Sequence, residues 1–226
     1  MSNNKNGKPR TKSGLRETFE LLVETAVFVF FVLTFVVQSF GIPTPSMEPT
    51  LLVGDFVLVN KMIAAGGSSA FERAVLPKRN LRRGDMVVFK APSENLGQDY
   101  VKRIVALEGE EVEIRGKEVR IDGRPLAEPY KVHLYGALRL ENDDFGPRTV
   151  PRGHLFVMGD NRDNSADSRA WGFLPRECVK GVPWIVYFSY RAEADAHLKT
   201  GLGDRLKRLV SFLPKARWGR LLCVVR

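Results

Sequence analysis

Residues 100–107 read YVKRIVAL, a run of apolar and β-branched residues interrupted by two adjacent basic residues, Lys102 and Arg103. This composition is typical of a β-strand with a buried face. Successive side chains of a strand point to opposite faces, so one of the two basic side chains is expected to point inward. Most lysines in strands face water, so an inward Lys102 would need a special reason. The segment predicts a strand and makes Lys102 a candidate functional residue.

Short runs of the same kind recur along the chain, bounded by turn residues and without long helices between them. They are Phe56–Val59, Met86–Phe89, Leu155–Met158 and Trp184–Phe188. In residues 112–121, apolar residues alternate with charged ones around Gly116 and Lys117, which predicts a hairpin with a two-residue turn. Together these patterns favour a mainly β, antiparallel fold over an α/β fold.

An apolar segment precedes the β-rich part. Residues 21–42 read LLVETAVFVFFVLTFVVQSFGI, in which Glu24 is the only charged residue. As a helix, this segment would span about 33 Å, enough to cross a bilayer core of about 30 Å. A buried helix of a soluble protein usually has a polar stripe, whereas residues 26–37 offer only Thr34. The segment therefore predicts one transmembrane helix. We expect an uncleaved signal anchor, because Ser39-Phe40-Gly41 matches a cleavage site only weakly and Pro43 crowds it.

The formal net charge of +9 is concentrated at the two ends of the chain. Residues 1–19 carry five Lys and Arg against one Glu, and residues 199–226 carry eight against one Asp. The part between them is nearly neutral, so a nucleic-acid-binding surface is not expected. The basic flank before the apolar segment places the N-terminus in the cytoplasm and the residues after Ile42 on the other side.

The basic tail has a helical pattern of its own. Leu202, Leu206 and Leu209 recur at spacings of three and four with basic residues between them, and the pattern stops near Pro214. This predicts a basic amphipathic helix. Two interpretations stay open: a helix on an anionic lipid surface with Trp218 as an interface anchor, or a solvated end.

The residues that could carry chemistry are few. Neither H-E-x-x-H nor C-x-x-C occurs, so no bound metal is expected, and no organic cofactor is expected either. No Ser-His-Asp set is apparent from spacing, so a nucleophile would need another base. Cys178 and Cys223 are read as free thiols. A buried lysine can replace histidine as a base, because desolvation lowers its pKa and leaves a neutral amine that accepts a hydroxyl proton. Lys102 is the best candidate for such a base.

Five ordered blocks lie between residues 45 and 169: PSMEPTL at 45–51, GD at 54–55, GDMVVF at 84–89, YVKR at 100–103 and GDNRDNSADSR at 159–169. In this order they resemble bacterial type I signal peptidases, the membrane-bound serine proteases that remove signal peptides from exported preproteins. The last block fits the family pattern throughout, and Trp171-Gly172-Phe173 extends the likeness.

The resemblance implies a catalytic dyad in which Ser46 is the nucleophile and Lys102 is its unprotonated base. Ser165 would hydrogen-bond the Lys102 amine and orient it. The Ser46 N–H and the Thr44 hydroxyl would form the oxyanion hole. Many relatives have a serine followed by a small residue at the Thr44-Pro45 position. Pro45 has no N–H, which is consistent with a hydroxyl at Thr44 as the second donor.

Three further residues of the last block are implied in supporting roles. Asp167 and Arg169 are expected to form an ion pair, and Asp160 is expected to support the site. The resemblance assigns no bound metal.

The resemblance also implies how the chain is organised and where it works. The expected parts are a cytoplasmic basic N-terminus (1–20), the transmembrane anchor (21–42), a catalytic β domain (43–107 and 153–198), an inserted smaller β region (108–152) and a basic tail (199–226). Some relatives have two N-terminal spans, whereas this chain offers one candidate. A single-pass monomer of the bacterial inner membrane is expected, with an extracytoplasmic catalytic domain. Its partners would be membrane lipids and the signal peptides of preproteins, bound as an added strand and cut at small-x-small sites.

Two other interpretations of the sequence are open. A self-cleaving Ser-Lys domain of the SOS-repressor type would need a DNA-binding module where the apolar segment stands. A catalytically silent, membrane-tethered β scaffold would have no evident need for Ser46, Lys102 and Ser165 together. A peptide cleavage assay separates the scaffold from the enzymes.

Overall fold

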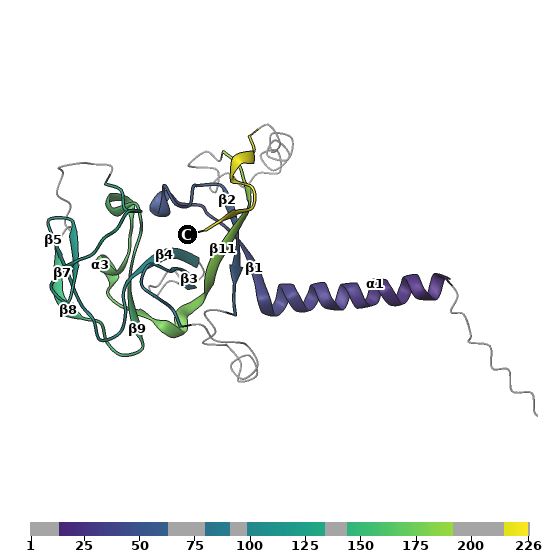
Figure 1. The fold of residues 1–226 in the computed structure, drawn as a ribbon, viewed down its shortest axis with the longest axis horizontal. Helices are drawn as coiled ribbons and strands as arrows, with labels where there is room; N and C mark the ends of the chain where they lie inside the picture. The colour runs from purple at the N-terminus through teal and green to yellow at the C-terminus, as the bar shows by residue number, and fades with distance from the viewer. Residues whose placement is uncertain (1–13, 63–79, 91–98, 134–143, 192–214, 226) are drawn as a thin grey trace, which may run out of the picture.

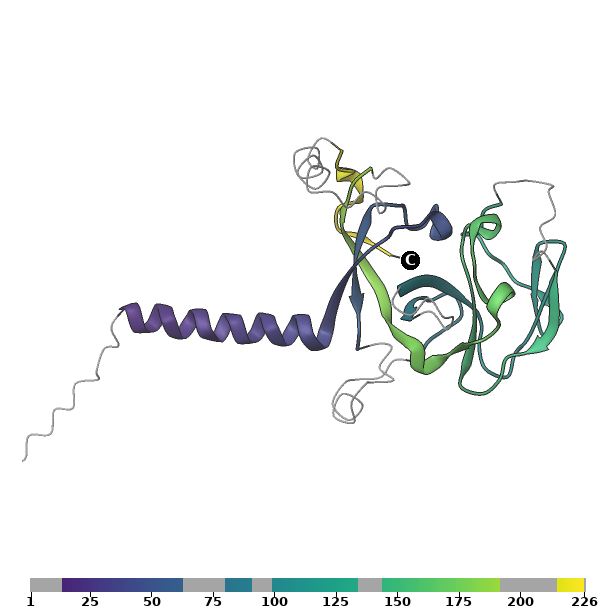
Figure 2. The ribbon, with the colours of Figure 1, turned by 180° about the vertical axis from the view of Figure 1, so that it is seen from behind.

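The computed structural model describes residues 14–62, 80–90, 99–133, 144–191 and 215–225. It begins with helix α1 (Gly14–Phe31), which a π-helical turn, η1 (Val32–Val36), extends. Helix α1 projects away from the β-rich remainder of the chain (Figures 1 and 2). The 21 residues Arg16–Val36 have a mean hydropathy of 2.2, and none of this helix is buried within the protein. It is long and apolar enough to cross a membrane.

The helix occupies a different range from the predicted anchor at 21–42. It starts earlier and ends at Val36, because Val37–Gly41 forms strand β1, which pairs antiparallel with β2 (Asp55–Asn60). A continuous apolar run does not by itself distinguish a helix from a strand. Here the edge of β2 supplies backbone partners for residues 37–41, and Ile42 is buried in the core that follows. The apolar segment therefore divides between the helix and the sheet.

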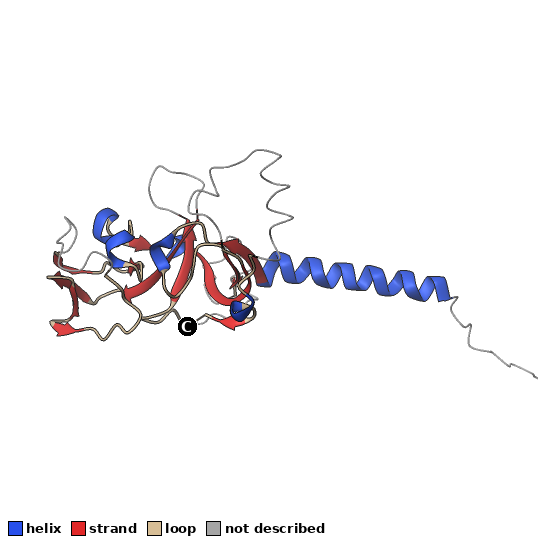
Figure 3. Cartoon of the chain, turned by 90° about the horizontal axis from the view of Figure 1, so that it is seen from above, coloured by secondary structure: helices blue, strands red, loops and turns tan. Residues whose placement is uncertain are grey.

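Eight of the described strands form one antiparallel sheet. Figure 3 colours the strands of both sheets red. Along the sheet the order is β1-β2-β11-β3-β4-β9-β10, and β12 pairs with β11. The members not yet given are β3 (Met86–Lys90), β4 (Asp99–Ala106), β9 (His154–Met158), β10 (Leu174–Pro175), β11 (Val179–Ser189) and β12 (Cys223–Val224). Each of the five runs predicted as strands corresponds to one strand of this sheet, except that β4 ends at Ala106, one residue before the end of the run at 100–107. The mainly β antiparallel fold is confirmed.

A smaller sheet of four strands, ordered β7-β6-β5-β8, lies at the end of the molecule away from α1 (Figures 1 and 2). Its strands are β5 (Glu111–Arg115), β6 (Glu118–Ile121), β7 (Arg124–Pro125) and β8 (Phe145–Thr149), all within the 108–152 range expected for an inserted region. Gly116 and Lys117 both have positive φ and join β5 to β6, so the predicted two-residue hairpin is confirmed.

Short helical turns connect the strands and carry several polar groups of the site. They are η2 (Pro45–Met47), η3 (Arg162–Asn164), α3 (Ser168–Trp171), η4 (Arg176–Cys178) and η5 (Trp218–Arg220). The helix predicted at about 201–214 lies outside the described residues. Trp218, proposed as its interface anchor, is 60% exposed.

Candidate active site

The turn that carries Ser46 is anchored in the core from both sides. Turn η2 lies between β1 and β2, and Met47 and Leu51 pack into a buried apolar cluster with Val57 and Val88. These anchors leave Ser46 at the edge of the cluster, where it is 8% exposed. Ile42, which precedes the turn, belongs to the same cluster, so buried apolar residues before and after Ser46 fix the backbone of the candidate nucleophile.

Asn161 holds the same turn through two hydrogen bonds. Its backbone N–H donates to the Ser46 carbonyl at 3.1 Å, and its side-chain amide donates to the Pro45 carbonyl at 3.2 Å. Asn161 in turn pairs with Val132, which lies between β7 and β8 of the smaller sheet. No role was predicted for Asn161 from the sequence. Its place in the block at 159–169 was the one feature that could have indicated a role at the site.

Lys102 lies on β4, between β3 and β9, and is 2% exposed. Its Nζ donates to the Ser46 Oγ at 2.7 Å. Burial penalises the ammonium form and lowers the pKa of Lys102 to about 8, although the charges of Asp167 and Asp160 oppose the shift. A substantial fraction of Lys102 is therefore neutral just above neutral pH, and the neutral amine can accept the Ser46 proton.

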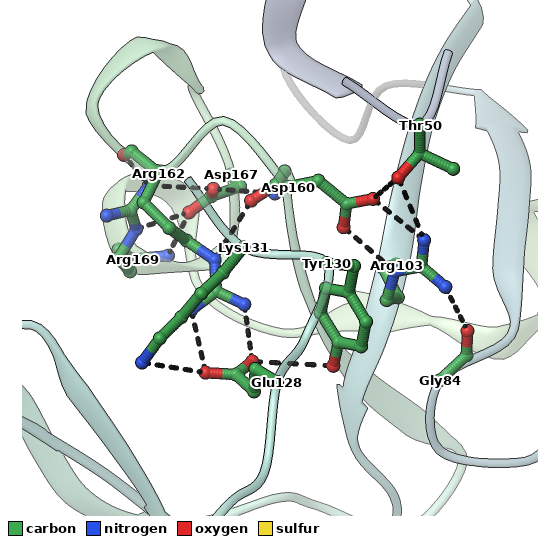
Figure 4. A network of polar contacts seen from close by, with 11 residues as sticks. Thr50, Gly84, Arg103, Glu128, Tyr130, Lys131, Asp160, Arg162, Asp167 and Arg169 are labelled. Atoms are coloured by element: carbon green, nitrogen blue, oxygen red, sulfur yellow. Dashed lines mark hydrogen bonds and ion pairs between the residues drawn. The ribbon is translucent and has the colours of Figure 1, made fainter. Parts of the chain in front are cut away.

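Arg103, the next residue of β4, is also buried, and Figure 4 shows its polar partners. The sequence predicted that one of Lys102 and Arg103 points inward, but both are inside because both faces of β4 are covered. Arg103 makes a bidentate ion pair with Asp160, at 2.8 and 2.7 Å, and donates to the Gly84 carbonyl at 2.7 Å. The ring of Tyr130 lies 4.0 Å from its guanidinium carbon. These partners compensate for burial of the Arg103 charge.

The two other predicted hydroxyls differ in their placement. Thr44 Oγ1 lies 3.5 Å from Ser46 Oγ, beside the candidate nucleophile. Ser165 Oγ is buried and, among the described residues, has no hydrogen-bond partner. The predicted hydrogen bond between Ser165 and Lys102 is therefore not made in this structure. The Ser165 side chain instead lies against Gly159, where a β-carbon would come within 2.4 Å of Oγ.

Asp167 and Arg169 form the expected ion pair, with Arg169 Nε 2.8 Å from Asp167 Oδ1. The Asp167 carboxylate also accepts from the Gly159 N–H at 3.0 Å, and Arg169 donates to the Arg162 carbonyl at 2.6 Å. Ser165 lies within the turn that these contacts close. The pair therefore fixes the segment that carries Ser165 against the segment that carries Gly159.

A buried ion pair connects the site to the segment between β7 and β8 of the smaller sheet. The Arg162 guanidinium makes a bidentate pair with Glu128, whose Oε2 lies 3.0 Å from Nη1 (Figure 4). Arg162 Nε donates to the Gly159 carbonyl at 3.0 Å. Neither residue was singled out from the sequence, because a charged pair separated by 34 positions has no local pattern.

A cleft of about 460 Å³ opens beside Ser46. It lies between the end of β1 with the turn after it and the start of β4. The residues that line it are Phe40, Gly41, Ile42, Pro43, Thr44, Ser46, Met47, Val88, Asp99, Tyr100 and Val101. Most of these side chains are apolar, so the cleft suits a ligand segment with apolar side chains. Within the described residues, no group of three or more His, Cys, Asp or Glu side chains could hold a metal ion.

The sequence of the chain matches a known protein family. The family model described as "Signal peptidase, peptidase S26" matches residues 15–188. The chain belongs to this signal peptidase family. It is therefore a peptidase, and family membership favours this interpretation over the repressor-type and scaffold interpretations.

Individual signal peptidases are similar in sequence to this chain over most of its length. Signal peptidase I of Aquifex aeolicus is 34% identical over 216 residues, covering 71% of this chain and 79% of its own. The probable signal peptidase I-1 of Synechocystis is 32% identical and covers 92% of this chain and 87% of its own. A solved signal peptidase I from Enterococcus faecalis is 35% identical and covers 46% of this chain and 97% of its own. The TM-score of this match is 0.38.

Gly159 is a further residue of this signal peptidase site that sequence reasoning did not single out. A β-carbon here would lie 2.4 Å from Ser165 Oγ and 2.5 Å from the Ser46 carbonyl oxygen. Atoms at such distances must move, and one of them belongs to the backbone of Ser46. We expect Gly159→Ala to reduce kcat by about 100-fold or more, the usual effect of displacing a reacting group by about 1 Å. Steady-state cleavage of a preprotein measures the effect.

Gly14→Ala is the matched control, since a β-carbon at Gly14 meets nothing within 4 Å. Gly159→Ala protein that folds and cleaves at the wild-type rate would show that Ser46 does not depend on this close approach.

Proposed function

We propose that this chain is a membrane-anchored serine endopeptidase that removes N-terminal signal peptides from exported preproteins, with Ser46 as nucleophile and Lys102 as general base. The observation that carries the proposal is the 2.7 Å contact between Lys102 Nζ and Ser46 Oγ, with both groups buried. A lysine whose pKa is lowered to about 8 is suited to this role, because a base works best when its pKa is near the working pH.

The reaction would proceed in two proton-coupled steps. As Ser46 Oγ attacks the scissile carbonyl, its proton passes to the neutral Lys102 amine. The resulting ammonium then gives that proton to the departing amine, the C–N bond breaks and an acyl-enzyme remains. In the second step, Lys102 takes a proton from water as the water oxygen attacks the ester, and Ser46 recovers its proton when the ester bond breaks. No metal or organic cofactor is needed for either step.

The oxyanion of each tetrahedral intermediate would accept hydrogen bonds from the Ser46 N–H and the Thr44 hydroxyl. The position of Thr44 Oγ1 beside Ser46 Oγ supports this role. Ser165 would orient the Lys102 amine through its hydroxyl, which has no hydrogen-bond partner among the described residues. Asp160, Asp167 and Arg169 would act indirectly, by fixing the backbone around these groups.

The substrate would bind as an extended segment in the cleft beside Ser46. An added strand obtains affinity from its backbone, and alternate side chains enter pockets. Shallow apolar walls such as Ile42 and Val88 would favour small residues one and three positions before the cut, which gives the small-x-small rule. Phe40 and Gly41 place one wall of this cleft on the strand that directly follows the apolar helix.

The proposed location follows from the N-terminal helix and the charge pattern. Helix α1 with η1 would cross the bacterial inner membrane once, the basic N-terminus would remain in the cytoplasm, and the β part would lie on the extracytoplasmic side. The chain would act as a monomer on preproteins at the lipid surface.

Cleavage of a purified preprotein with a small-x-small site, in detergent or liposomes, tests this function. We expect one cut, and the N-terminus of the product should begin directly after the small-x-small site. An intact preprotein after incubation with folded wild-type chain would contradict the proposal.

Thr44 offers a specific test of the oxyanion hole. Thr44→Val removes the hydroxyl but keeps the shape of the side chain, and loss of one such donor typically reduces kcat by about 10²- to 10³-fold. Thr44→Ser should retain most of the activity because it keeps the donor. The rates of preprotein cleavage give both values, and Thr149→Val, at an exposed position of β8, is the matched control. Equal rates for the wild type and Thr44→Val would remove Thr44 from the oxyanion hole.

A further inference from the structure

The last described segment of the chain, residues 215–225, packs against the large sheet and is called here the C-terminal segment. It lies beyond residues 15–188, the part that matches the family model. Strand β12 pairs with β11, and the Val225 N–H donates to the Trp184 carbonyl at 2.8 Å. Near its start, Ala216 forms a bridge with Tyr190. Backbone pairing thus fixes the segment at both of its ends.

Two arginines of this segment reach a buried carboxylate, that of Asp55 at the start of β2. Arg220 makes a bidentate ion pair with Asp55, with Nη2 2.6 Å from Oδ2 and Nε 3.2 Å from Oδ1. Arg217 Nη1 lies 3.8 Å from Oδ1. The Asp55 side chain is fully buried and also accepts from the Ser189 hydroxyl at 2.6 Å and the Leu52 N–H at 2.9 Å. A carboxylate in this position needs a cation, and the C-terminal segment supplies it.

The same arginines bind the loop that joins the Ser46 turn to β2. Arg220 Nη2 donates to the Thr50 carbonyl at 3.0 Å, and Arg217 Nη1 donates to the Val53 carbonyl at 2.9 Å. These bonds fix residues 48–54 at two points. Arg220 therefore joins the Thr50 backbone and the Asp55 carboxylate in one rigid unit.

Thr50 connects this unit to the residues around the dyad. Its hydroxyl donates to Asp160 Oδ2 at 2.6 Å, the oxygen that also pairs with Arg103. One residue later, the Leu51 N–H donates to the Met47 carbonyl at 2.9 Å, next to Ser46. A shift of Thr50 would be transmitted along both paths, to the Ser46 turn and to the strand that carries the candidate base.

We propose that Arg220 is a positioning residue for the peptidase reaction, and that the C-terminal segment completes the active site by holding the loop behind Ser46. Arg220 contacts neither Ser46 nor the cleft, so it acts through Thr50 and Asp55. The inference rests on the proposed function, because it concerns the rate of the Ser46 reaction. A consequence is that a residue outside 15–188, the range that matches the family model, affects kcat.

The test compares full-length variants in preprotein cleavage, well below the midpoint of thermal unfolding of each. We expect Arg220→Gln to lower kcat by about tenfold or more, with KM changed less than about twofold, because the substrate does not touch this residue. Arg220→Lys should recover part of the loss. Lysine keeps a cation beside Asp55. Unlike arginine, it cannot make a planar bidentate contact with Asp55 and also donate to the Thr50 carbonyl. A role in stability alone would lower the unfolding midpoint and leave kcat unchanged.

Arg124→Gln, at an exposed position of the smaller sheet, is the matched control and should retain wild-type kcat. If Arg220→Gln leaves Asp55 uncompensated and the protein does not fold, the double variant Arg220→Gln with Asp55→Asn removes the buried charge and should fold with reduced kcat. Wild-type kcat in any folded variant without the Arg220 guanidinium overturns the inference while the proposed function stands. Absence of cleavage by the wild type contradicts the proposed function itself.

Discussion

Lys102→Met is expected to reduce kcat for preprotein cleavage by about 10⁴-fold or more, the scale found when the base of a serine protease is removed. Methionine has a similar length and fits an apolar site, but it accepts no proton from the Ser46 hydroxyl. Lys102 is buried and penalised by desolvation, so its loss should not destabilise the fold. We therefore expect a folded protein with a normal unfolding midpoint and almost no turnover.

The control for Lys102→Met is Lys90→Met. Lys90 ends β3, is exposed, and belongs to the strand next to β4. Both variants should unfold at temperatures close to the wild type, which circular dichroism can measure. Lys102→Met that folds and cleaves within tenfold of the wild type would mean that another group takes the Ser46 proton.

Ser46→Ala should abolish cleavage to a similar extent, because no covalent acyl-enzyme can form. The backbone of the turn is held by Asn161 and by the packing of Met47, and neither contact uses the Ser46 hydroxyl. The variant should therefore keep its fold and still bind the preprotein. Single-turnover cleavage measures the chemical step, and co-sedimentation of intact preprotein with enzyme-containing liposomes measures binding.

Ser39→Ala is the matched control, since Ser39 lies on β1 and its hydroxyl is hydrogen-bonded to Tyr187 at the surface. It should cleave at close to the wild-type rate. Formation of the same product by Ser46→Ala, at a rate above that of buffer alone, would assign the nucleophile to another residue.

The sequence was most informative where a pattern is local. Alternating and β-branched runs predicted strands that the structure contains, and Gly116-Lys117 predicted the correct hairpin. The block at 159–169 pointed to the family to which the chain belongs. The predicted end of the transmembrane helix was wrong at Val37–Gly41. There the apolar run continues from a helix into a strand, and only pairing with β2 decides the conformation.

The site was less predictable because its supporting contacts join distant positions. Burial of both Lys102 and Arg103 depends on groups that cover the two faces of β4, among them Tyr130. The close approach at Gly159 depends on where Ser46 and Ser165 come to lie in the folded chain. Arg220 is 165 positions from Asp55, and nothing in the local sequence of either residue indicates the pair.

The central claim is that a neutral Lys102 activates Ser46, and the pH dependence of kcat/KM tests it most directly. Lys102 is protonated and inactive below its pKa of about 8 and neutral above it, so activity should rise with pH and then level off. For a single group with that pKa, the neutral fraction rises about tenfold between pH 7 and pH 9. We predict a profile with an apparent pKa near 8 for the folded, membrane-reconstituted chain. A flat profile across neutral and alkaline pH, with chemistry rate-limiting, would contradict Lys102 as the base.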